Sequence, residues 1–429
     1  MTTEAPSGGA ARRRLTAAAL VLNRFTGFAL SMLLLAVASL VVIPAMVHAS
    51  GADAWGVIAA GQSIGAVAAV VIAFGWGMSG PARIARADEA GRLTEYTEAL
   101  VAKLIIFVPV GAIAFVAAWL IGGRYPAYAA VGALTAASIG LTANWYFVGM
   151  AQPYTMLLVE TLPRVAGTVV GIAFMLSGSS ALAGLLCQLG GMLAAFTACT
   201  LLILRPWDRH RSARPRRRPL STVLREQRHG LSSSVVSASY AAAPIVIVGL
   251  VAPAVLPTYA IIDKVQRQIN AALAPYITVL QGWVPRGTAE GIRLRVRRAL
   301  VVSAAGGAVL ALVLLLIAPE LLGWLGRGQI QPPYAALVLM VVIIAVNMCE
   351  SVASKVCLSA LDRLDVAARA TVTATVVGIV LIVAGVFFWG VLGALTGILA
   401  GLVLRIVLEL LGMRRRGPAG SGAPNPGRL

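Results

Sequence analysis

The chain alternates between long apolar stretches and short polar segments. Each apolar stretch is long enough for an α-helix to cross a hydrocarbon core of about 30 Å. The pattern therefore predicts an all-α polytopic membrane protein with about twelve transmembrane helices. The predicted spans are residues 20–47, 56–78, 99–121, 127–149, 155–177, 180–204, 230–252, 257–281, 299–318, 333–358, 368–389 and 390–411.

The composition agrees with this pattern. Hydrophobic residues make up 59% of the 429 residues, and charged residues make up 12%. Soluble domains carry about 25% charged residues, so most of this protein's surface is expected to contact lipid and not water.

Arginines gather on alternate connections between the spans. Residues 205–229 hold nine arginines and residues 282–298 hold five, whereas the opposite connections hold Arg124 and Arg327. Because basic connections stay in the cytoplasm, both termini are predicted to be cytoplasmic. A basic chain can also bind nucleic acid. Charge runs between spans are explained by topology and by anionic lipid headgroups, so membrane lipids and no nucleic acid are expected as partners.

The Arg/Pro-rich segment 205–229 divides the chain into similar halves. We predict an N-terminal six-helix lobe over 1–204, a cytoplasmic linker over 205–229 and a C-terminal six-helix lobe over 230–413. Residues 414–429 are expected to form a disordered tail. Six helices on each side of a linker are typical of a transporter built from two repeats.

The sequence does not favour an enzyme. It contains no HExxH, GxSxG, Walker A or CxxC motif, and no connection is long enough to fold as a catalytic domain. The four cysteines fall inside predicted spans without metal-ligand spacing: Cys187, Cys199, Cys349 and Cys357. We therefore expect a transporter with no cofactor and no metal site.

Ionisable residues inside the spans are the candidate functional groups. Each costs about 2.5–3.5 kcal/mol near the bilayer centre, so each needs a partner or a water-filled cavity. Three pairs have i,i+4 spacing and share a helix face: Glu160 with Arg164, Asp263 with Arg267, and Arg405 with Glu409. Such pairs have a purely structural interpretation as well, because each carboxylate neutralises its own arginine.

The group on predicted span 257–281 differs, because Asp263, Lys264 and Arg267 together leave one positive charge. With Arg24 in the first span, this charge favours an aqueous cavity that receives a phosphate or diphosphate. The candidate anion-binding residues are Arg24, Arg164, Lys264, Arg267 and Lys355. The candidates for coupling transport to a cation are Glu160, Asp263 and Glu350.

Four motifs of the chain match the pattern of one known family. They are the aromatic junction from Asn144 to Tyr154, the pair Trp55-Gly56, the stretch from Gly75 to Arg83, and the stretch from Thr258 to Val265, closed by Pro285-Arg286. These motifs resemble those of lipid-linked oligosaccharide flippases, the polysaccharide-exporter branch of the multidrug/oligosaccharidyl-lipid/polysaccharide superfamily. In that family they correspond to the junction between helices 4 and 5, the start of helix 2, its cytoplasmic end, and the lysine-bearing helix 8.

This resemblance implies a MATE-like fold in the bacterial inner membrane. It implies a flippase that moves an undecaprenyl-diphosphate-linked oligosaccharide by alternating access around a central cationic cavity. The implied partners are this glycolipid and a polysaccharide polymerase or other cell-envelope glycan machinery. Family members often carry an acidic residue in helix 7, where this chain has Tyr240 to Pro244. That departure leaves Glu160 or Asp263 as the coupling candidates.

The alternative is a cation-coupled multidrug exporter of the same superfamily. Such an exporter is expected to line its cavity with carboxylates and aromatic rings. Here basic residues match or outnumber acidic ones within the spans, and aromatic residues are 6% of the chain. This balance favours the flippase, although it leaves the glycan and the coupling ion open.

Overall fold

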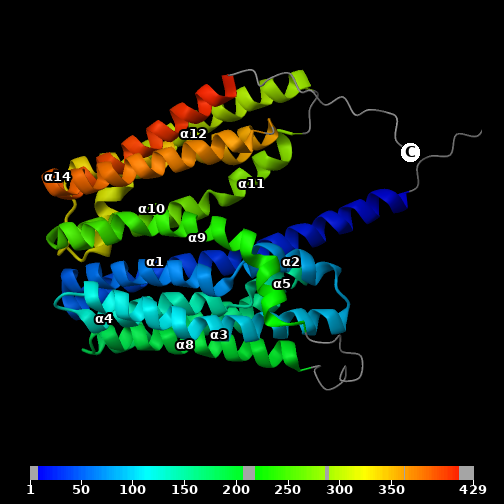
Figure 1. Cartoon of the computed structure of the whole chain (residues 1–429), viewed down its shortest axis with the longest axis horizontal. Coiled ribbons are helices and arrows are strands. Elements are labelled where there is room, and N and C mark those ends of the chain that lie inside the picture. The colour runs from blue at the N-terminus through cyan, green and yellow to red at the C-terminus, as the bar shows by residue number, and fades with distance from the viewer. Residues whose placement is uncertain (1–7, 206–217, 286–288, 362, 415–429) are drawn as a thin grey trace, which may run out of the picture. The chain divides into compact units, whose positions relative to one another are not determined.

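The computed structural model describes residues 8–205, 218–285, 289–361 and 363–414, and these residues form helices without strands (Figure 1). The elements are α1 (Gly8–Ala73), α2 (Trp76–Arg86), α3 (Glu89–Ile121), α4 (Pro126–Ala137), η1 (Ser138–Leu141), α5 (Asn144–Gly149), α6 (Pro153–Met156), η2 (Leu157–Thr161), α7 (Leu162–Leu176), α8 (Ala181–Leu204), α9 (Leu220–Val251), η3 (Pro253–Val255), α10 (Leu256–Ala272), α11 (Ala274–Trp283), α12 (Ala289–Leu325), α13 (Tyr334–Val352), η4 (Ala353–Leu358) and α14 (Leu364–Arg414).

Nine helical segments within the described residues are long and apolar enough to cross a membrane. The prediction of an all-α polytopic membrane protein is therefore confirmed. Two of the nine segments each correspond to two predicted spans. Thr26–Arg86 corresponds to spans 20–47 and 56–78, and Asp365–Met413 corresponds to spans 368–389 and 390–411. The predicted span 257–281 corresponds to the shorter helices α10 and α11. The count of twelve and the cytoplasmic termini stay predictions.

Glycine divides both of the longest helices. Gly51 inside α1 has φ 84° and ψ 168°, and Gly390 inside α14 has φ 54° and ψ −127°. Side chains rarely tolerate a positive φ, so glycine is the residue that can reverse the chain there without a connecting loop. The predicted boundary between spans 368–389 and 390–411 falls at Gly390.

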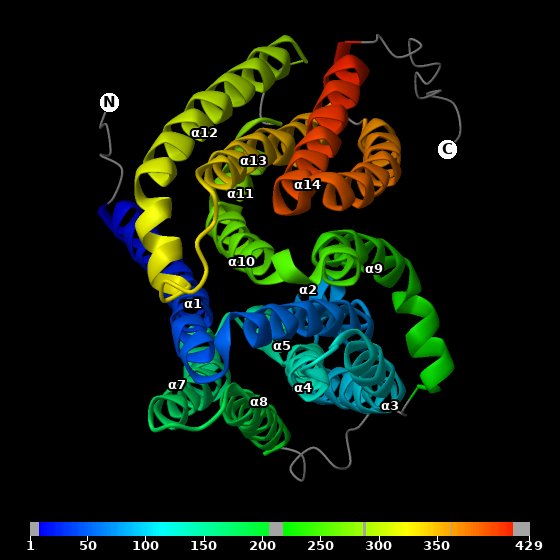
Figure 2. The ribbon, with the colours of Figure 1, turned by 90° about the vertical axis from the view of Figure 1, so that its left-hand side faces the viewer.

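The described chain forms two compact units. The first comprises the described residues of 1–249 with 325–329, and the second comprises those of 250–324 with 330–429. In the first unit α1 packs against α4, α3 packs against α4, and α7 lies beside α8 (Figure 2). Small residues permit this close approach: a Cβ on Gly61 would overlap the carbonyl oxygen of Ala129. Close backbone contact is a usual way for membrane helices to associate.

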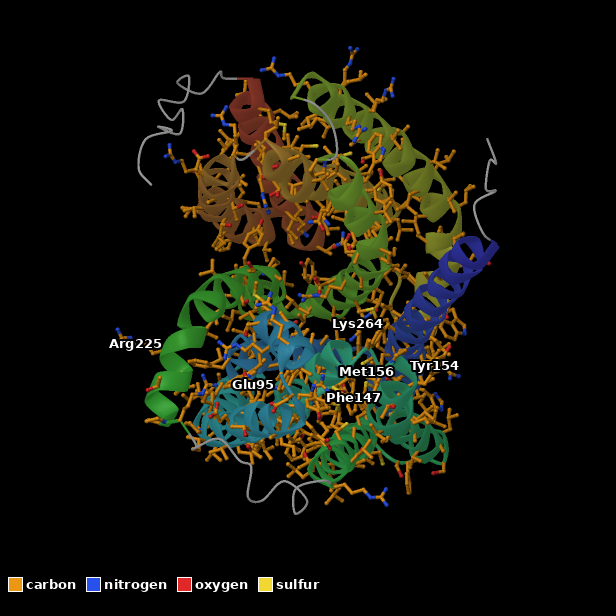
Figure 3. The ribbon with its side chains drawn as sticks, turned by 90° about the vertical axis from the view of Figure 1, so that its right-hand side faces the viewer. Glu95, Phe147, Tyr154, Met156, Arg225 and Lys264 are labelled. Carbon is orange, nitrogen blue, oxygen red and sulfur yellow. The ribbon has the colours of Figure 1, made fainter. Side chains whose placement is uncertain are left out.

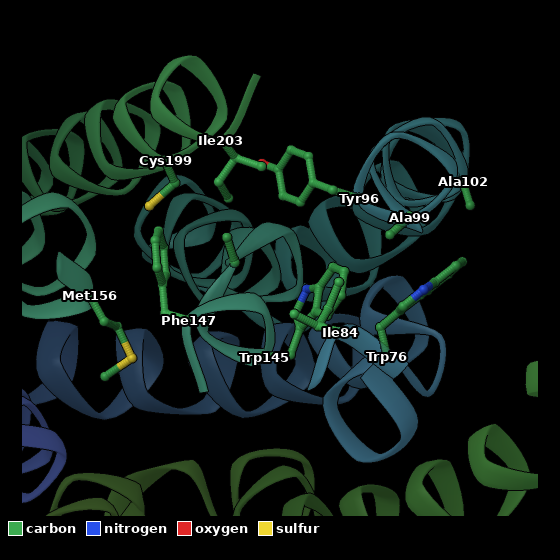
Figure 4. Packing of buried hydrophobic residues seen from close by; sticks show 11 residues of the cluster. Trp76, Ile84, Tyr96, Ala99, Ala102, Trp145, Phe147, Met156, Cys199 and Ile203 are labelled. Carbon is green, nitrogen blue, oxygen red and sulfur yellow. The ribbon is translucent and has the colours of Figure 1, made fainter. Parts of the chain in front are cut away.

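Aromatic residues fill the core of the first unit. Trp76, Tyr96, Trp145 and Phe147 are all buried, and Figure 4 shows these side chains of α2, α3 and α5 in one cluster. The rings of Tyr96 and Trp145 are stacked with centroids 6.2 Å apart. The aromatic junction that supports the family resemblance is therefore a packing element of this unit.

The second unit is organised around the contact between α13 and α14, with α10 and α11 beside α13. The helical path from α10 to α11 breaks at Leu273, two residues before Pro275. Proline lacks an amide hydrogen and its ring obstructs the preceding turn, which explains the break. This break positions part of the candidate site described next.

Candidate functional site

Glu160 and Arg164 form a buried ion pair in the first unit. Glu160 lies in η2, a π-helical turn, and its Oε1 is 3.6 Å from Nη1 of Arg164 in α7. The two side chains are 4% and 17% exposed. Since π turns are rare and are found frequently at functional sites, the turn favours a functional role for this pair. The two predicted residues are brought together, but they neutralise each other.

Lys103 of α3 is buried in the same unit, at the break between η1 and α5. Its Nζ donates a hydrogen bond to the carbonyl oxygen of Thr142 at 3.0 Å and lies 5.6 Å from the centroid of the Trp145 ring. A carbonyl at a helix end has no intrahelical donor, so the lysine supplies one. The ring face adds a cation–π attraction. Lys103 is therefore held by packing and a backbone contact, without a carboxylate.

The three charged residues of α10 in the second unit, Asp263, Lys264 and Arg267, form one ion pair and leave one lysine outside it. Nε of Arg267 lies 2.7 Å from Oδ2 of Asp263, as the i,i+4 spacing predicts. Lys264 is partly buried on the same helix (Figure 3). Within the residues that the structure describes, its ammonium forms no hydrogen bond or ion pair. The one net positive charge predicted for this group therefore resides at Lys264.

A second charged group joins α13 to α14. Nη2 of Arg405 lies 2.7 Å from Oε1 of Glu350, and its Nε donates to Oε1 of Glu409 at 3.2 Å. The same guanidinium donates to the hydroxyl of Ser354 at 3.2 Å. Glu350 and Glu409 are almost fully buried. One arginine therefore serves two carboxylates, and the sequence predicted only the pair with Glu409.

Lys355 lies in η4, the second π-helical turn, one turn beyond Glu350. Its side chain is exposed and reaches a cavity of about 280 Å³ inside the second unit. Its backbone carbonyl accepts a hydrogen bond from Nε2 of Gln281 at 3.3 Å. In the described part of the chain, the ammonium of Lys355 has no acidic partner within 4.0 Å.

The site residues follow a common pattern. Four carboxylates lie in ion pairs with arginine: Glu160, Asp263, Glu350 and Glu409. The three lysines of the chain, Lys103, Lys264 and Lys355, form no ion pair among the described residues. The predicted excess of positive charge therefore lies on lysines, and the predicted arginines Arg164 and Arg267 are both neutralised. The side chain of Arg24 lies outside the described residues.

Sequence reasoning missed an acidic cluster on α3. Arg218 contacts Glu98 at 2.6 Å and Glu95 at 3.3 Å, and Arg83 of α2 contacts Glu95 at 3.3 Å. Nε1 of Trp76 also donates to Glu95 at 3.1 Å (Glu95 is labelled in Figure 3). Arg218 is one of nine arginines in 205–229, and nothing in the sequence distinguishes it from the others. Its partners could be found only from the fold.

The described residues contain no group of three or more His, Cys, Asp or Glu side chains able to hold a metal ion. The free cysteines Cys199 and Cys357 are buried among apolar side chains.

Comparison with solved structures assigns the fold. The chain is similar to a multidrug resistance MATE family transporter of the MOP superfamily in an inward-facing conformation, with 14% identity and a TM-score of 0.69 over 88% of this chain and 94% of that one. A eukaryotic MATE transporter is 15% identical, with a TM-score of 0.49 over 94% of this chain and 96% of that one. A MATE in the bent conformation is 15% identical, with a TM-score of 0.49 over 92% of this chain and 94% of that one.

The first of these comparisons shows that the described chain has a MATE-type fold, which confirms the predicted fold class. No protein-family model and no curated protein matches the sequence. At this level of identity the likeness extends to the fold alone, so substrate and mechanism have to be argued from the chain's own residues.

Proposed function

We propose that this protein is a transporter of the bacterial inner membrane that flips an undecaprenyl-diphosphate-linked oligosaccharide to the external leaflet. It works by alternating access around a cationic cavity. The observation that carries this proposal is the difference between acidic and basic groups in the second unit. Arg267 pairs with Asp263, and Arg405 is shared by Glu350 and Glu409, whereas Lys264 and Lys355 form no ion pair among the described residues. The four basic groups therefore exceed the three carboxylates by one.

A lysine without a counter-ion is unfavourable in a membrane protein unless water or an anionic ligand reaches it. Diphosphate is a strong acceptor of charge-assisted hydrogen bonds, and an ammonium binds it as a compact point charge. An organic cation would be repelled by the same lysines. It would also compete with arginine for each of the three carboxylates in this unit.

A cation-coupled multidrug exporter is the second candidate. The observation in its favour is that the solved structure with the TM-score of 0.69 is a multidrug resistance transporter. In that case Glu160, Asp263 or Glu350 would have to exchange its arginine for a proton, a sodium ion or the drug. The flippase needs no such exchange, and for this reason we favour it.

Transport in proteoliposomes separates the two candidates. Purified full-length protein is reconstituted with a fluorescent undecaprenyl-diphosphate disaccharide, and external quenching measures how fast label moves between leaflets. A parallel preparation carries ethidium under an imposed proton or sodium gradient. The flippase is expected to accelerate glycolipid movement and to leave ethidium unmoved. Gradient-driven ethidium transport without glycolipid movement would overturn the proposal.

A partner follows from the same chemistry. A flipped glycan is delivered to the external leaflet, where a polysaccharide polymerase or other cell-envelope glycan enzyme would consume it. Crosslinking in native membranes, followed by mass spectrometry of captured proteins, tests this part of the proposal. Capture of efflux components in place of glycan enzymes would count against it.

A further inference from the structure

The second unit contains a polar cavity whose lining is unusual for membrane helices. Its volume is about 280 Å³, below the range of about 300–1,000 Å³ of drug-sized sites. It therefore suits one small group and not a whole oligosaccharide. The polar side chains that line it are Asn270, Thr278, Gln281, Asn347, Ser351 and Lys355.

Two helical stripes supply these groups. Asn347, Ser351 and Lys355 follow one another at four-residue intervals along α13 and η4, so the first two share a helix face. Asn270, Thr278 and Gln281 come from the opposite wall, where α10 breaks into α11. Polar groups are costly on membrane helices and mark binding paths or water-filled cavities. Two such stripes facing one cavity therefore indicate a ligand site.

The cavity has hydrogen-bonding capacity that the protein leaves unused. The side-chain oxygen of Asn270 is buried and has no hydrogen-bond partner among the described residues. Buried polar atoms are nearly always satisfied, so such an atom points to a missing water or ligand. Among the described residues the ammonium of Lys355 likewise forms no ion pair, and the nearby Glu350 pairs with Arg405 at 2.7 Å. The cavity is thus lined by one cation, three amides and two hydroxyls. Two of these groups already donate within the protein: Oγ1 of Thr278 to the carbonyl of Ala274, and Nε2 of Gln281 to that of Lys355.

This inventory matches a sugar that carries one phosphate. Amide and hydroxyl side chains both donate and accept, as the hydroxyl groups of a sugar require. The ammonium of Lys355 supplies the contact for an anionic oxygen. Leu273, Ile277 and Met348 also line the cavity and offer an apolar surface for the carbon face of a sugar ring.

We propose that this cavity of the second unit binds a single glycosyl phosphate, with Lys355 on the phosphate and the amide side chains on the sugar hydroxyls. The inference deepens and rests on the proposed function, because the sugar next to the diphosphate of the lipid carrier is such a group. The cavity lies close in sequence to the Arg-rich connection 282–298, which the charge pattern predicts to be cytoplasmic. A substrate loaded from the cytoplasmic leaflet would meet it first.

A phospholipid headgroup with a glycerol phosphate presents similar chemistry, so the test compares both sources. Full-length protein in phosphatidylcholine nanodiscs is titrated with glucose 1-phosphate, glycerol 1-phosphate, glucose and inorganic phosphate, and binding is measured by saturation-transfer NMR. Glucose 1-phosphate is expected to bind more tightly than the other three probes. Equal or tighter binding of glycerol 1-phosphate would overturn the assignment in favour of a lipid headgroup.

Variants assign the contact to residues. Lys355→Met is expected to weaken glucose 1-phosphate binding about tenfold or more, the effect of losing a hydrogen bond to a charged group. Lys355→Arg should restore part of it. Asn347→Leu should weaken glucose 1-phosphate binding and leave the weak inorganic phosphate signal unchanged. Arg369→Met, an exposed change elsewhere in the unit, is the matched control. Unchanged affinity in Lys355→Met would overturn the proposal.

The binding experiment and the transport experiment can fail independently, so the cavity assignment and the proposed function are tested separately. Lys355-dependent binding of glucose 1-phosphate in a protein that moves no glycolipid would leave the cavity assignment standing and remove the flippase. Glycolipid movement without Lys355-dependent binding would do the reverse. Each variant is also checked for a monodisperse elution profile, and Lys355→Arg shows whether a loss reflects charge or misfolding.

Discussion

The lysines of the two units have different surroundings. In the first unit Glu160 pairs with Arg164, and Lys103 is enclosed against the Thr142 carbonyl and the Trp145 ring. In the second unit Lys264 is only partly buried, and Lys355 is exposed at a polar cavity. Glu160, Arg164 and Lys103 of the first unit therefore each contact a protein group, whereas Lys264 and Lys355 of the second form no hydrogen bond or ion pair with their charged groups among the described residues.

This difference separates charges that hold helices together from charges that can bind. A buried ion pair is weak evidence for function, because removing one partner is costly whatever the site does. Among the described residues, the ammonium groups of Lys264 and Lys355 form no hydrogen bond or ion pair that would hold two helices together. The sharpest experiments therefore exchange residues of the two kinds and measure stability and transport together.

The largest effect is expected at Arg405, which serves two buried carboxylates. Arg405→Leu leaves Glu350 and Glu409 without their cation and should lower the free energy of unfolding by about 3–5 kcal/mol. The thermal unfolding midpoint in detergent measures this. Arg405→Leu combined with Glu350→Gln and Glu409→Gln should regain most of the loss. Arg369→Leu on the exposed side of α14 is the control, and an equal loss there would contradict the assignment.

The three lysines give the most direct test of the comparison. Lys103→Met leaves the Thr142 carbonyl without its donor and should lower stability by about 1–3 kcal/mol. Lys264→Met and Lys355→Met remove no partner, so their unfolding midpoints should stay close to the parent's. Their glycolipid transport should fall about tenfold, while Lys103→Met should retain its rate per folded molecule. Stability losses in all three lysine variants would contradict the difference that we infer between Lys103 in the first unit and the two lysines of the second.

The glycine kinks should respond alike in the two units, because their cause is the backbone and not charge. Gly51→Ala and Gly390→Ala would each force a side chain into a region almost restricted to glycine, at a cost of about 1–3 kcal/mol. A Cβ at Gly51 has nothing within 4 Å, so the loss there is conformational strain alone. Gly190→Ala, in open space within α8, is the control and should be neutral or stabilising. Unfolding midpoints decide the outcome.

Hydropathy was enough to predict the helical membrane fold, because each apolar stretch had to be a helix of spanning length. It could not show where helices break. Leu273, the turn at η2 and the turn at η4 interrupt predicted spans without interrupting their hydropathy. Such breaks depend on prolines and on contacts with neighbouring helices. The hydropathy of one sequence does not show which helices are neighbours.

The candidate site was predicted in part. The i,i+4 spacing identified the pairs Glu160–Arg164 and Asp263–Arg267, because that contact is local. The contact between Glu350 and Arg405 spans two helices, so no spacing rule could find it. Whether Lys264 and Lys355 face a substrate is untested by the structure and stays a prediction. The cavity beside Lys355 could not be predicted, because its lining residues come from separate helices whose packing the sequence does not give.

The smallest effect is expected at the exposed end of the first unit, where Arg218 contacts Glu95 and Glu98. The side chain of Arg218 is 38% exposed, so its ion pairs are screened by water and salt. Arg218→Ala should lower stability by at most about 1 kcal/mol, and the loss should shrink as NaCl rises from low to high concentration. The loss at Arg405 should change less over the same series, because its side chain is only 19% exposed. A salt-independent loss at Arg218 would place this contact with the buried pairs, and the exposed fraction of the arginine would then no longer separate the two kinds of charge.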